Sequence, residues 1–480
     1  MSKKLYDIFE RVAVRNPGKV AFHFTDRSIT YQALQESIRE CESELIRIGV
    51  EEGTKVLLQM EEPEIFACMI LAIWKLHALF IPIEKKVTDE ELIRVKEESK
   101  CNFYITTFGS SGDLNYLKGH YAFVRYQKII QKEVSCQEET ALMFYTSGTT
   151  GLPKCVAFNH VAMTNNVMTV AEKMNLSAED VFYTPLALTL PATITTVLLP
   201  SLCCGTALFI SETQLPRVIL RNIESNLITV FFAVPYMYEL MIETMNTAEN
   251  NPFKNVRVCV SSSAFMKPHI FEQFYKKTNL FIHSIYCSSE AGAITYNDGE
   301  DLETIKNSVG RPLPGVQVQI LADGKEAEEN ESGEIIVSGV SMSNGYFNRP
   351  QLHKEVFLEC GVKTGDLAYK DKNGFITLCG RISDVINVAG YLVNPKEVED
   401  LIITMDGIAE AVVYAVSKDV IGEYVAAKVI LKDKHQVISE QDIIKYCSQH
   451  MSNYKVPRKI EFVESIQAGR YGKKVRKYKV

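Results

Sequence analysis

The chain has 480 residues, more than one ordinary hydrophobic core can organise, so we expect two or more domains. Its net charge of -7 shows no basic bias, so nucleic-acid binding finds no support in the composition. The 12 cysteines form no CxxC pair, which argues against zinc sites and disulfide scaffolds and favours reduced thiols in a cytoplasmic protein.

The N-terminal segment MSKKLYDIFERVAV has no apolar core of the kind found in signal peptides. Two longer apolar stretches, 66–83 and 192–210, were tested as membrane spans. The first is interrupted by a lysine and a histidine, and the second by a proline and a glycine. Each stretch therefore predicts a buried helix that leads into a buried strand, and we expect no membrane association.

Up to about residue 310, runs rich in β-branched and aromatic residues alternate with helical stretches. Near the N-terminus the pattern predicts a strand at 56–59, a helix that ends near residue 75 and a strand at 79–83. From residue 140 it predicts strands at 141–146, 207–210, 228–233, 256–261 and 280–285, separated by helices at 216–225, 236–245 and 267–277. Such alternation is typical of mostly parallel sheets covered by helices, so the expected fold class is α/β.

The pattern changes after residue 310. The segment GRPLPG, residues 310–315, is rich in turn-forming residues, and alternating apolar runs at 316–321 and 333–337 predict a small β subdomain. The acidic segment 323–334 is interpreted as a solvated hairpin loop.

A small, mobile α+β domain is expected at the C-terminal end. Asn394, Pro395 and Glu397 stand in the order of an N-cap, a first helical residue and a capping-box acid, which predicts the start of a helix. Further strands are expected at 408–416 and 424–431 and a helix at 439–450. We therefore predict a large N-terminal domain of residues 1–383 and a small domain of residues 384–480.

The stretch YTSGTTGLPK, residues 145–154, follows an apolar strand and combines hydroxyl side chains, glycines and a lysine. Small residues let backbone N–H groups approach an anion closely, hydroxyl groups donate hydrogen bonds, and the lysine adds a positive charge. A polyphosphate is the anion that this combination suits best. The candidate ligands are Thr146, Ser147, Gly148, Thr149, Thr150, Gly151 and Lys154.

Two other interpretations of this stretch fit less well. A P-loop of the form GxxxxGK[ST] does not fit, because Gly148 and Gly151 are too close together. In addition, Cys155 follows Lys154 where a P-loop has Ser or Thr. A polar surface loop fits the composition, but the full decapeptide is more specific than such a loop requires.

The decapeptide resembles the phosphate-binding signature of the adenylate-forming superfamily, which includes acyl- and aryl-CoA synthetases, peptide-synthetase adenylation domains and luciferases. Nearly all of the chain follows the motif order of this superfamily. The resemblance implies an AMP-forming acid–thiol ligase that uses ATP and Mg²⁺, with its other site residues in motifs farther along the chain.

The sequence YCSSE, residues 286–290, resembles the Y-G-x-T-E motif of this superfamily. The resemblance implies that Tyr286 stacks on adenine, that Ser289 hydrogen-bonds phosphate and that Glu290 holds Mg²⁺. A carboxylate beside a phosphate loop is costly unless a divalent cation lies between them, so the chemistry agrees. Taken alone, Ser-Ser-Glu would be interpreted as the capping pattern of a helix.

The sequence SSSA, residues 261–264, stands where the superfamily has a Gly-Gly-Ala wall against the adenine. Ser263 and Ala264 are the corresponding candidates for contact with the base. Small residues are needed in this place because a flat base lies against the backbone, and serine in place of glycine thickens the wall.

Two further motifs concern the ribose and the domain junction. Asp366 lies in TGDL, which matches the superfamily without change, and one carboxylate can accept hydrogen bonds from both ribose hydroxyl groups. GRISD, residues 380–384, resembles G-R-x-x-D. This resemblance implies that Arg381 contacts the ribose or a phosphate and that Asp384 is the hinge about which the small domain turns. In isolation, TGDL would be interpreted as an ordinary Gly-Asp turn.

The chain ends in AGRYGKKVRKYKV, where six of the last eleven residues are basic. Such a run is usually a solvated tail. The resemblance implies that Lys473 is the catalytic lysine, whose ammonium group offsets the charge between the attacking carboxylate and the α-phosphate. The Pro-x-Thr that usually precedes this lysine is absent, so Lys474 is a second candidate.

The motifs together predict activation of a carboxylic acid to an acyl-adenylate and transfer to a pantetheine thiol. By resemblance, Leu188 and Thr189 lie in the acid pocket, where some relatives have an aspartate that binds an α-ammonium group. A buried ammonium without that carboxylate would be costly, so an aryl or acyl acid is favoured over an amino acid. The length and a missing histidine favour phosphopantetheine on a carrier protein as the acceptor, and free CoA is the alternative.

A non-catalytic nucleotide-binding member of the same fold is the remaining alternative. The departures at Cys155, Asn387 and the missing Pro-x-Thr favour it. The enzyme interpretation is favoured more strongly, because the charged residues expected at the site are all present: Lys154, Glu290, Asp366, Arg381 and Lys473.

Overall fold

A computed structural model of the chain describes residues 4–108, 115–118, 123–130, 139–146, 154–245, 251–388, 391–418, 422–433 and 438–466. Its residues divide by their contacts into two compact units. The first comprises Met1–Val318 with Val337–Val362, and the second Gln319–Ile336 with Lys363–Val480. The predicted boundary at 383/384 rests on the expected hinge at Asp384 and stays a prediction.

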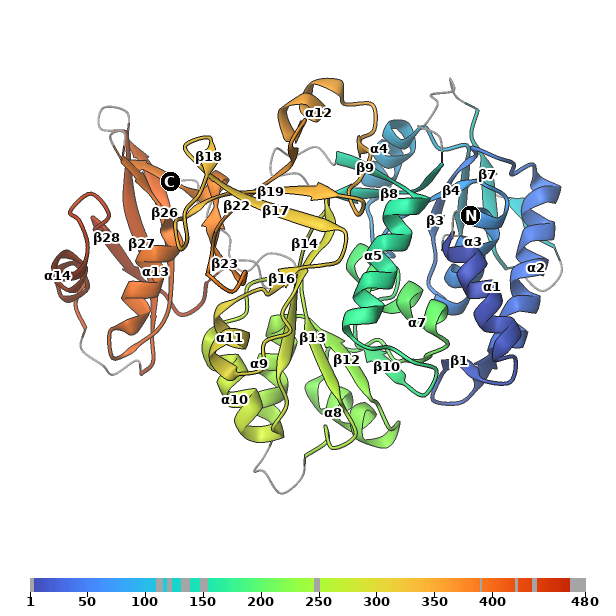
Figure 1. Ribbon diagram of the computed structural model, residues 1–480, viewed down its shortest axis with the longest axis horizontal. Helices are drawn as coiled ribbons and strands as arrows, with labels where there is room; N and C mark the ends of the chain where they lie inside the picture. The colour runs from blue at the N-terminus through green and yellow to red at the C-terminus, as the bar shows by residue number, and fades with distance from the viewer. Residues whose placement is uncertain are drawn as a thin grey trace. The chain divides into compact units, whose positions relative to one another are not determined.

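The first unit contains two sheets (Figure 1). The described strands of one sheet, in spatial order, are β16 (Arg311–Pro312), β15 (Gly292–Tyr296), β14 (Ile282–Ser288), β13 (Val258–Ser261), β12 (Val230–Ala233), β10 (Val181–Thr184), β11 (Ala207–Ile210), β1 (Val20–His23) and β2 (Ser28–Thr30). From β14 to β1 all neighbours are parallel. The antiparallel pairs are at the two edges.

The second sheet of this unit has a parallel centre and antiparallel margins. Its described strands, in order, are β20 (Gly345–Tyr346), β9 (Lys154–Asn159), β8 (Thr140–Thr146), β4 (Leu79–Pro82), β3 (Lys55–Gln59), β5 (Phe103–Thr106), β7 (Arg125–Lys128) and β6 (Asn115–Tyr116). β8, β4, β3 and β5 are parallel, while β9 folds back on β8 as an antiparallel partner. The predicted mostly parallel sheets are confirmed.

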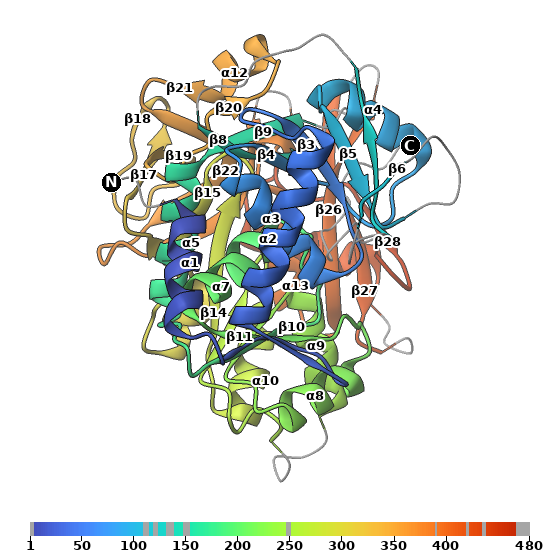
Figure 2. The same cartoon turned by 90° about the vertical axis from the view of Figure 1, so that its right-hand side faces the viewer.

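Helices cover both sheets. Their bounds are α1 (Leu5–Arg15), α2 (Tyr31–Ile48), α3 (Pro63–Lys75), α4 (Asp89–Ser99), α5 (His160–Lys173), α8 (Pro216–Ser225), α9 (Pro235–Thr244), α10 (Pro268–Thr278), α11 (Leu302–Asn307) and α12 (Pro350–Val356). Figures 1 and 2 show α1, α2 and α3 side by side. Helix α5 contacts β8 and β9 of one sheet and β15 of the other, so it links the two sheets.

The two apolar stretches tested as membrane spans are internal elements. Helix α3 is buried along almost its whole length, and the indole N–H of Trp74 donates to the backbone carbonyl of Ala141 at 2.8 Å. The second stretch forms α6 (Pro191–Thr193), a π-helical turn (Ile194–Leu198) and α7 (Leu199–Cys204) before β11. Among the helices that the structure describes, none has the length and apolar character needed to cross a membrane.

A third sheet follows the turn-rich segment near residue 310, and the division between the two units passes through it. Its described strands are β18 (Lys325–Glu326), β17 (Val316–Ala322), β19 (Gly333–Gly339), β22 (Gly361–Lys370) and β21 (Phe357–Leu358), with β23 (Ile376–Arg381) paired to β22. The acidic segment 323–334, predicted as a hairpin loop, also contains the short strand β18. This sheet is the β region that the alternating pattern predicted.

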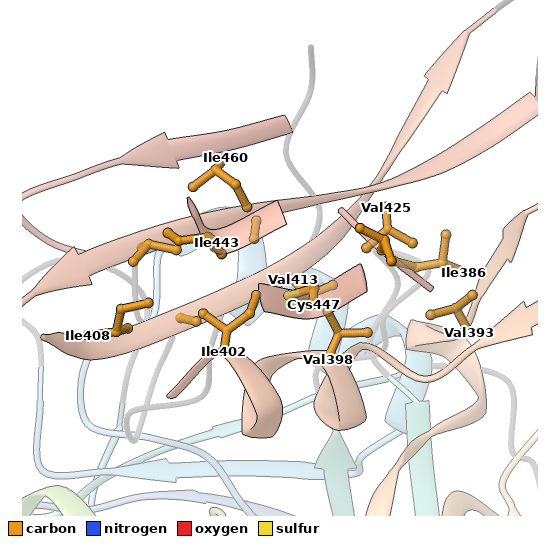
Figure 3. Packing of buried hydrophobic residues seen from close by; sticks show 14 of the residues in the cluster. Ile386, Val393, Val398, Ile402, Ile408, Val413, Val425, Ile443, Cys447 and Ile460 are labelled. Carbon is orange, nitrogen blue, oxygen red and sulfur yellow. The ribbon is translucent and has the colours of Figure 1, made fainter. Parts of the chain in front are cut away.

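The second unit has its own core (Figure 3). Its remaining elements are a 3₁₀ turn (Ile382–Asp384), β24 (Ile386–Val388), β25 (Tyr391–Val393), α13 (Pro395–Thr404), β26 (Ile408–Lys418), β27 (Gly422–Leu431), α14 (Glu440–His450) and β28 (Lys459–Phe462). Side chains of α13, such as Val398 and Ile402, cluster with Val413 of β26 and Cys447 of α14. Burial of this mixed set holds the helices on the β26–β27–β28 sheet.

The start of α13 differs from the predicted capping box. The Asn394 side chain accepts from the backbone N–H of Lys396 at 3.0 Å, one residue earlier than a capping box requires. Glu397 instead accepts from Lys455 Nζ at 2.6 and 2.8 Å. A nearby cation therefore holds the acid that was expected to cap the helix.

A buried ion pair fixes the start of β10. Asp180 is 4% exposed and accepts from Arg257 Nε at 2.8 Å, Arg257 Nη2 at 2.7 Å and Thr229 Oγ1 at 2.7 Å. Burial acts to raise the pKa of Asp180, but hydrogen bonds from Arg257, Thr229 and the backbone of Ser177 outweigh it, so the pKa lies below its ordinary value.

Replacement of Asp180 by Asn is expected to lower the free energy of unfolding by about 2–4 kcal/mol, because Arg257 loses its buried counter-charge. The guanidinium keeps some access to water, since its side chain is 36% exposed, so we expect the loss to stay within that range. Denaturant unfolding at pH 7 measures the loss. Glu90→Gln, which removes the exposed acid of the surface pair between Glu90 and Arg94, is the control and should leave the midpoint unchanged.

The sign of the pH effect follows from the depressed pKa. The contribution of Asp180 is present above the unfolded pKa of a carboxyl group, about 4, and is lost as the pH falls through the lower folded value. The difference between wild type and Asp180→Asn should therefore stay constant from about pH 5 to 8 and shrink below about pH 4. A difference that grows on acidification would contradict this assignment.

Candidate functional site

The described ends of the hydroxyl-rich stretch belong to two antiparallel strands. Thr146 ends β8 and Lys154 begins β9, and the two residues are paired across the hairpin. The predicted ligands Ser147, Gly148, Thr149, Thr150 and Gly151 lie outside the described residues. A P-loop leads from a strand into a helix, whereas this stretch leads into a second strand, so the structure independently argues against a P-loop.

Cys155, inside the same stretch, has a packing role. Its side chain is buried, and its Sγ lies 3.4 Å from Sδ of Met143 on the neighbouring strand. Cys155 stands where a P-loop has a metal-binding hydroxyl group, and here the side chain is packed in the protein interior.

Tyr346 connects the two charged candidates of the first unit. Its hydroxyl group donates to Oε1 of Glu290 at 2.6 Å. Nζ of Lys154 lies 5.3 Å from the centroid of its ring, within the range of a cation–π contact. The structure thus brings Lys154, at the start of β9, together with Glu290, in the turn after β14. The two residues are 136 positions apart in the sequence (290 − 154).

Three backbone hydrogen bonds hold Tyr346 in this place. Asn344 N donates to Ala157 O at 2.7 Å and Phe347 N donates to Cys155 O at 2.8 Å, which attaches the segment to β9. Ser343 N donates to the carbonyl of Glu290 at 3.1 Å. The segment around Tyr346 is therefore fixed to the hairpin on one side and to the β14–β15 turn on the other.

Sequence reasoning did not identify Tyr346. The motif that contains Glu290 and the motif that contains Lys154 were both recognised, but β20 has only two residues and carries no pattern of its own. The one local signal is Gly345, whose φ is +102° and whose hypothetical Cβ would meet the His353 ring at 2.1 Å. A glycine required by both conformation and space marks a segment whose backbone path is fixed.

The predicted adenine contacts lie on the neighbouring strands β13 and β14. Ser261 is paired with Ser284, which places the segment that follows β13 beside Tyr286. Ser262 strengthens this pairing, because its hydroxyl group donates to Ile285 O at 2.8 Å. The predicted base-contacting groups Ser263, Ala264 and Tyr286 therefore belong to adjacent strand ends.

Ser263 has an unusual backbone conformation. Its φ of +76° lies in the left-handed region, where a non-glycine residue costs about 1–3 kcal/mol. Ser261, at the end of β13, is buried, and its hydroxyl group has no hydrogen-bond partner among the described residues. Strain and an unsatisfied hydroxyl group at one strand end are what a binding segment typically shows.

Ser289 and Glu290 form the tight turn between β14 and β15. Ser289 is exposed and Glu290 is half-buried. The Ser288 hydroxyl group accepts from the backbone N–H of Ala291 at 3.0 Å. The Ser-Ser-Glu tripeptide thus closes a hairpin, and the helix start that the tripeptide alone would have suggested is not formed.

Asp366 and Arg381 form an ion pair within the second unit. They are opposite each other on β22 and β23, and Arg381 Nε lies 2.8 Å from Asp366 Oδ1. Asp366 is 6% exposed, while the Arg381 side chain is half-exposed. The backbone N–H of Asp366 donates to Thr364 Oγ1 at 3.1 Å, so the TGDL motif fixes its own backbone at Asp366.

The predicted acid-pocket residues Leu188 and Thr189 lie in the loop after β10, at the carboxyl end of a parallel strand. Both are buried. The hydroxyl group of Thr189 has no hydrogen-bond partner among the described residues. β10 and β13 are separated only by β12 in the sheet, so this loop lies at the same sheet edge as the Ser261–Ala264 segment.

The last two predicted residues belong to the C-terminal part of the chain. Asp384 ends the 3₁₀ turn after β23. Lys473 lies outside the described residues, as does its neighbour Lys474. Their roles stay predictions.

The donor set near Glu290 was tested for its fit to Mg²⁺. No group of three potential metal ligands occurs in the described part of the chain. Mg²⁺ is usually bound by one or two carboxylates together with phosphate oxygens and water, so the single half-buried carboxylate of Glu290 fits such a site. Glu290 would supply a hard oxygen ligand, with its other oxygen held by Tyr346.

Comparison with known sequences identifies the family. The sequence model described as AMP-binding enzyme matches residues 9–347, and the model described as AMP-binding enzyme C-terminal domain matches residues 397–473. The long-chain-fatty-acid–CoA ligase FadD13 of Mycobacterium tuberculosis is 25% identical over 467 residues, which cover 94% of this chain and 92% of the ligase.

Solved structures show the same fold. ATP-bound MatB from Rhodopseudomonas palustris is 23% identical, with a TM-score of 0.84 over 98% of this chain and 97% of MatB. The o-succinylbenzoate CoA synthetase MenE from Bacillus subtilis, in complex with the acyl-adenylate intermediate OSB-AMP, is 22% identical, with a TM-score of 0.81 over 99% of this chain and 97% of MenE. The predicted fold class is confirmed. The two family matches cover most of the chain in motif order, and the chain therefore belongs to the AMP-binding enzyme family as an AMP-forming ligase.

Proposed function

We propose that the protein activates a carboxylic acid with ATP to an acyl-adenylate and transfers the acyl group to a pantetheine thiol. The observation that carries this proposal is the convergence of Glu290 and of Lys154, the last residue of the hydroxyl-rich stretch, on Tyr346. A cation and a carboxylate held together beside a phosphate-binding loop suit a nucleotide triphosphate with its divalent metal. Membership of the AMP-binding enzyme family supports the same reaction.

In the first step, a carboxylate oxygen of the acid attacks the α-phosphorus of ATP, and pyrophosphate leaves. Lys154 and the hairpin would hold the β- and γ-phosphates, and Lys473 would offset the negative charge that gathers around the α-phosphorus. In the second step, a thiolate attacks the acyl carbon, the thioester forms and AMP leaves. Bound Mg²⁺ would supply charge neutralisation at the phosphates, with Glu290 as its protein ligand.

Neither step needs a protein nucleophile. The described cysteines are mostly buried, and burial raises the pKa of Cys204 to about 11 and the pKa values of Cys203 and Cys259 still further. Thiols that stay protonated at neutral pH are poor nucleophiles. The burial of these cysteines therefore agrees with a reaction that depends on positioning and electrostatics.

An aryl or acyl acid is the proposed substrate class. Leu188 and Thr189 leave the predicted pocket position without a carboxylate, so a buried α-ammonium group would have no counter-charge there. The unsatisfied hydroxyl group of Thr189 could serve a polar substituent of the acid. FadD13 acts on long-chain fatty acids and MenE on o-succinylbenzoate, both of which lack an α-ammonium group.

The acceptor is a pantetheine thiol, on either a carrier protein or free CoA. The sequence prediction preferred a carrier protein. FadD13 and MenE, which match this chain over more than nine tenths of their length, are named as CoA enzymes, and this supports free CoA. Both acceptors carry the same pantetheine arm with its thiol, and they differ in the molecule to which that arm is attached.

Acid-dependent exchange of labelled pyrophosphate into ATP, measured with a panel of aryl and acyl acids, tests the activation step. We expect exchange with at least one acid and none with α-amino acids. The responsive acid is then incubated with ATP and either CoA or a phosphopantetheinylated carrier protein, and thioester is measured by mass spectrometry. If no acid supports exchange although the protein binds ATP, the non-catalytic alternative stands.

Asp366→Asn is expected to raise the KM for ATP about 10-fold, because hydrogen bonds to a charged acceptor contribute about 1.5–3 kcal/mol each and the amide keeps only part of them. The wild type should discriminate against 2′-deoxy-ATP and 3′-deoxy-ATP, and the variant should lose that discrimination. Asp400→Asn, which changes an exposed carboxylate on α13 of the same unit, is the control. Unchanged discrimination in Asp366→Asn would exclude Asp366 as the ribose ligand.

A further inference from the structure

The side chain of Tyr346 is fixed at both ends. Its ring packs edge-on against Phe357, with ring centroids 5.5 Å apart, and Phe357 stacks on His353 at 4.6 Å. At the other end, its hydroxyl group is bound to Glu290. The ring plane therefore has little freedom to rotate, and the hydroxyl group points at one carboxylate oxygen.

The hydroxyl group can act only as a donor toward this carboxylate. A tyrosine hydroxyl group is protonated at neutral pH and has one hydrogen to donate. An ionised carboxylate accepts hydrogen bonds and cannot donate them, so the polarity of the Tyr346–Glu290 contact is defined.

The ring face serves a different group. Lys154 Nζ stands over it at 5.3 Å from the centroid, where the quadrupole of the aromatic ring attracts a cation. One side chain therefore orients a carboxylate through its edge and an ammonium group through its face.

We propose that Tyr346 is a positioning residue of the nucleotide site: it turns Glu290 so that one oxygen remains for the metal of the metal–nucleotide complex, and it places Lys154 toward the phosphates. The proposal rests on the proposed function for the identity of the ligand. It goes beyond that function by assigning separate tasks to the hydroxyl group and to the ring.

Two substitutions separate these tasks. Tyr346→Phe removes the hydroxyl group and keeps the ring, so it should weaken binding of the Mg²⁺ complex of ATP about 10- to 100-fold, the usual effect of losing a partner that orients a metal ligand. Binding of ATP in the presence of EDTA should change by less than about 2-fold, because Lys154 keeps its ring contact. Tyr346→Leu removes both, so it should weaken binding of ATP with and without metal.

Isothermal titration calorimetry with ATP, with and without Mg²⁺, measures these affinities without requiring turnover. Tyr31→Phe is the matched control, since its buried hydroxyl group donates to the carbonyls of Ser201 at 3.1 Å and Thr206 at 3.0 Å in another part of the first unit. It should lower the melting temperature and leave the metal dependence of ATP binding as in wild type. A merely structural role of Tyr346 would affect both ATP forms equally.

A double-mutant cycle tests whether Tyr346 acts through Glu290. Tyr346→Phe should have almost no further effect on Mg²⁺-dependent binding in a Glu290→Ala background, because the oriented group is then absent. An undiminished effect in that background would overturn the proposal, as would unchanged metal dependence in Tyr346→Phe alone. Metal-dependent ATP binding by a wild type that exchanges pyrophosphate with no acid would instead reject the proposed function and leave this inference standing.

Discussion

Replacing Lys473 with alanine is expected to lower the rate of acid-dependent adenylate formation by about 10²–10³-fold, the effect of removing one group that stabilises developing charge in a transition state. Negative charge accumulates where the carboxylate approaches the α-phosphate. An ammonium group placed there stabilises the transition state more than it stabilises the bound substrates. The match to the family's C-terminal domain extends to residue 473 and so includes this lysine.

The second half-reaction provides the internal comparison. Thioester formation from a chemically prepared acyl-adenylate does not need charge stabilisation at the α-phosphorus, so Lys473→Ala should keep most of that rate. Lys474→Ala is the matched control in the same basic tail and should leave both steps near wild type. Full adenylation by Lys473→Ala together with loss in Lys474→Ala would move the assignment by one residue, and full activity of both would remove it.

Glu290→Gln is expected to lower kcat/KM for pyrophosphate exchange by about 10²-fold, since it removes the negative charge proposed to bind Mg²⁺. The amide oxygen of glutamine can still accept the Tyr346 hydrogen bond, so the fold of the β14–β15 turn should be retained. Measurement of exchange at increasing Mg²⁺ concentration should show a higher half-saturating concentration in the variant.

Glu303→Gln is the control for this substitution, because Glu303 is an exposed acid on α11 that pairs with Lys306. Its Mg²⁺ titration should superimpose on that of the wild type. If Glu290→Gln lost activity without any change in its Mg²⁺ requirement, Glu290 would not be the metal ligand.

The helices and strands could be predicted because the sequence patterns that specify them are local. The helix expected at 216–225 has the same bounds in the structure, and the strand expected at 207–210 does too. Pro216 and the apolar spacing of the helix act within a few residues of each other, which is the range over which sequence patterns are informative.

Contacts between distant segments were not predictable in the same way. Nothing near Tyr346 in the sequence indicates that its hydroxyl group reaches Glu290, because a tertiary hydrogen bond from Ser343 N to the carbonyl of Glu290 creates that proximity. The capping box at Asn394 failed for a related reason, since Lys455 from a distant turn binds Glu397. Local patterns define the elements, and tertiary contacts decide which partner a polar side chain takes.

The sequence predicted which residues belong to the candidate site, but it did not predict how these residues are arranged in space. The motif residues Lys154, Glu290 and Asp366 were identified from sequence, and the structure gives each a partner: the Tyr346 ring, the Tyr346 hydroxyl group and Arg381. The swivel about Asp384 and the role of Lys473 rest on the family's motifs alone and stay predictions.

The most direct measurement uses an acid labelled with oxygen-18 in its carboxylate. If a carboxylate oxygen attacks the α-phosphorus, AMP released after thioester formation carries one labelled oxygen, which mass spectrometry detects. Attack at the terminal phosphorus would place the label in inorganic phosphate and yield ADP. Labelled AMP is the predicted result, and unlabelled AMP or labelled phosphate from an acid-dependent reaction would contradict the account.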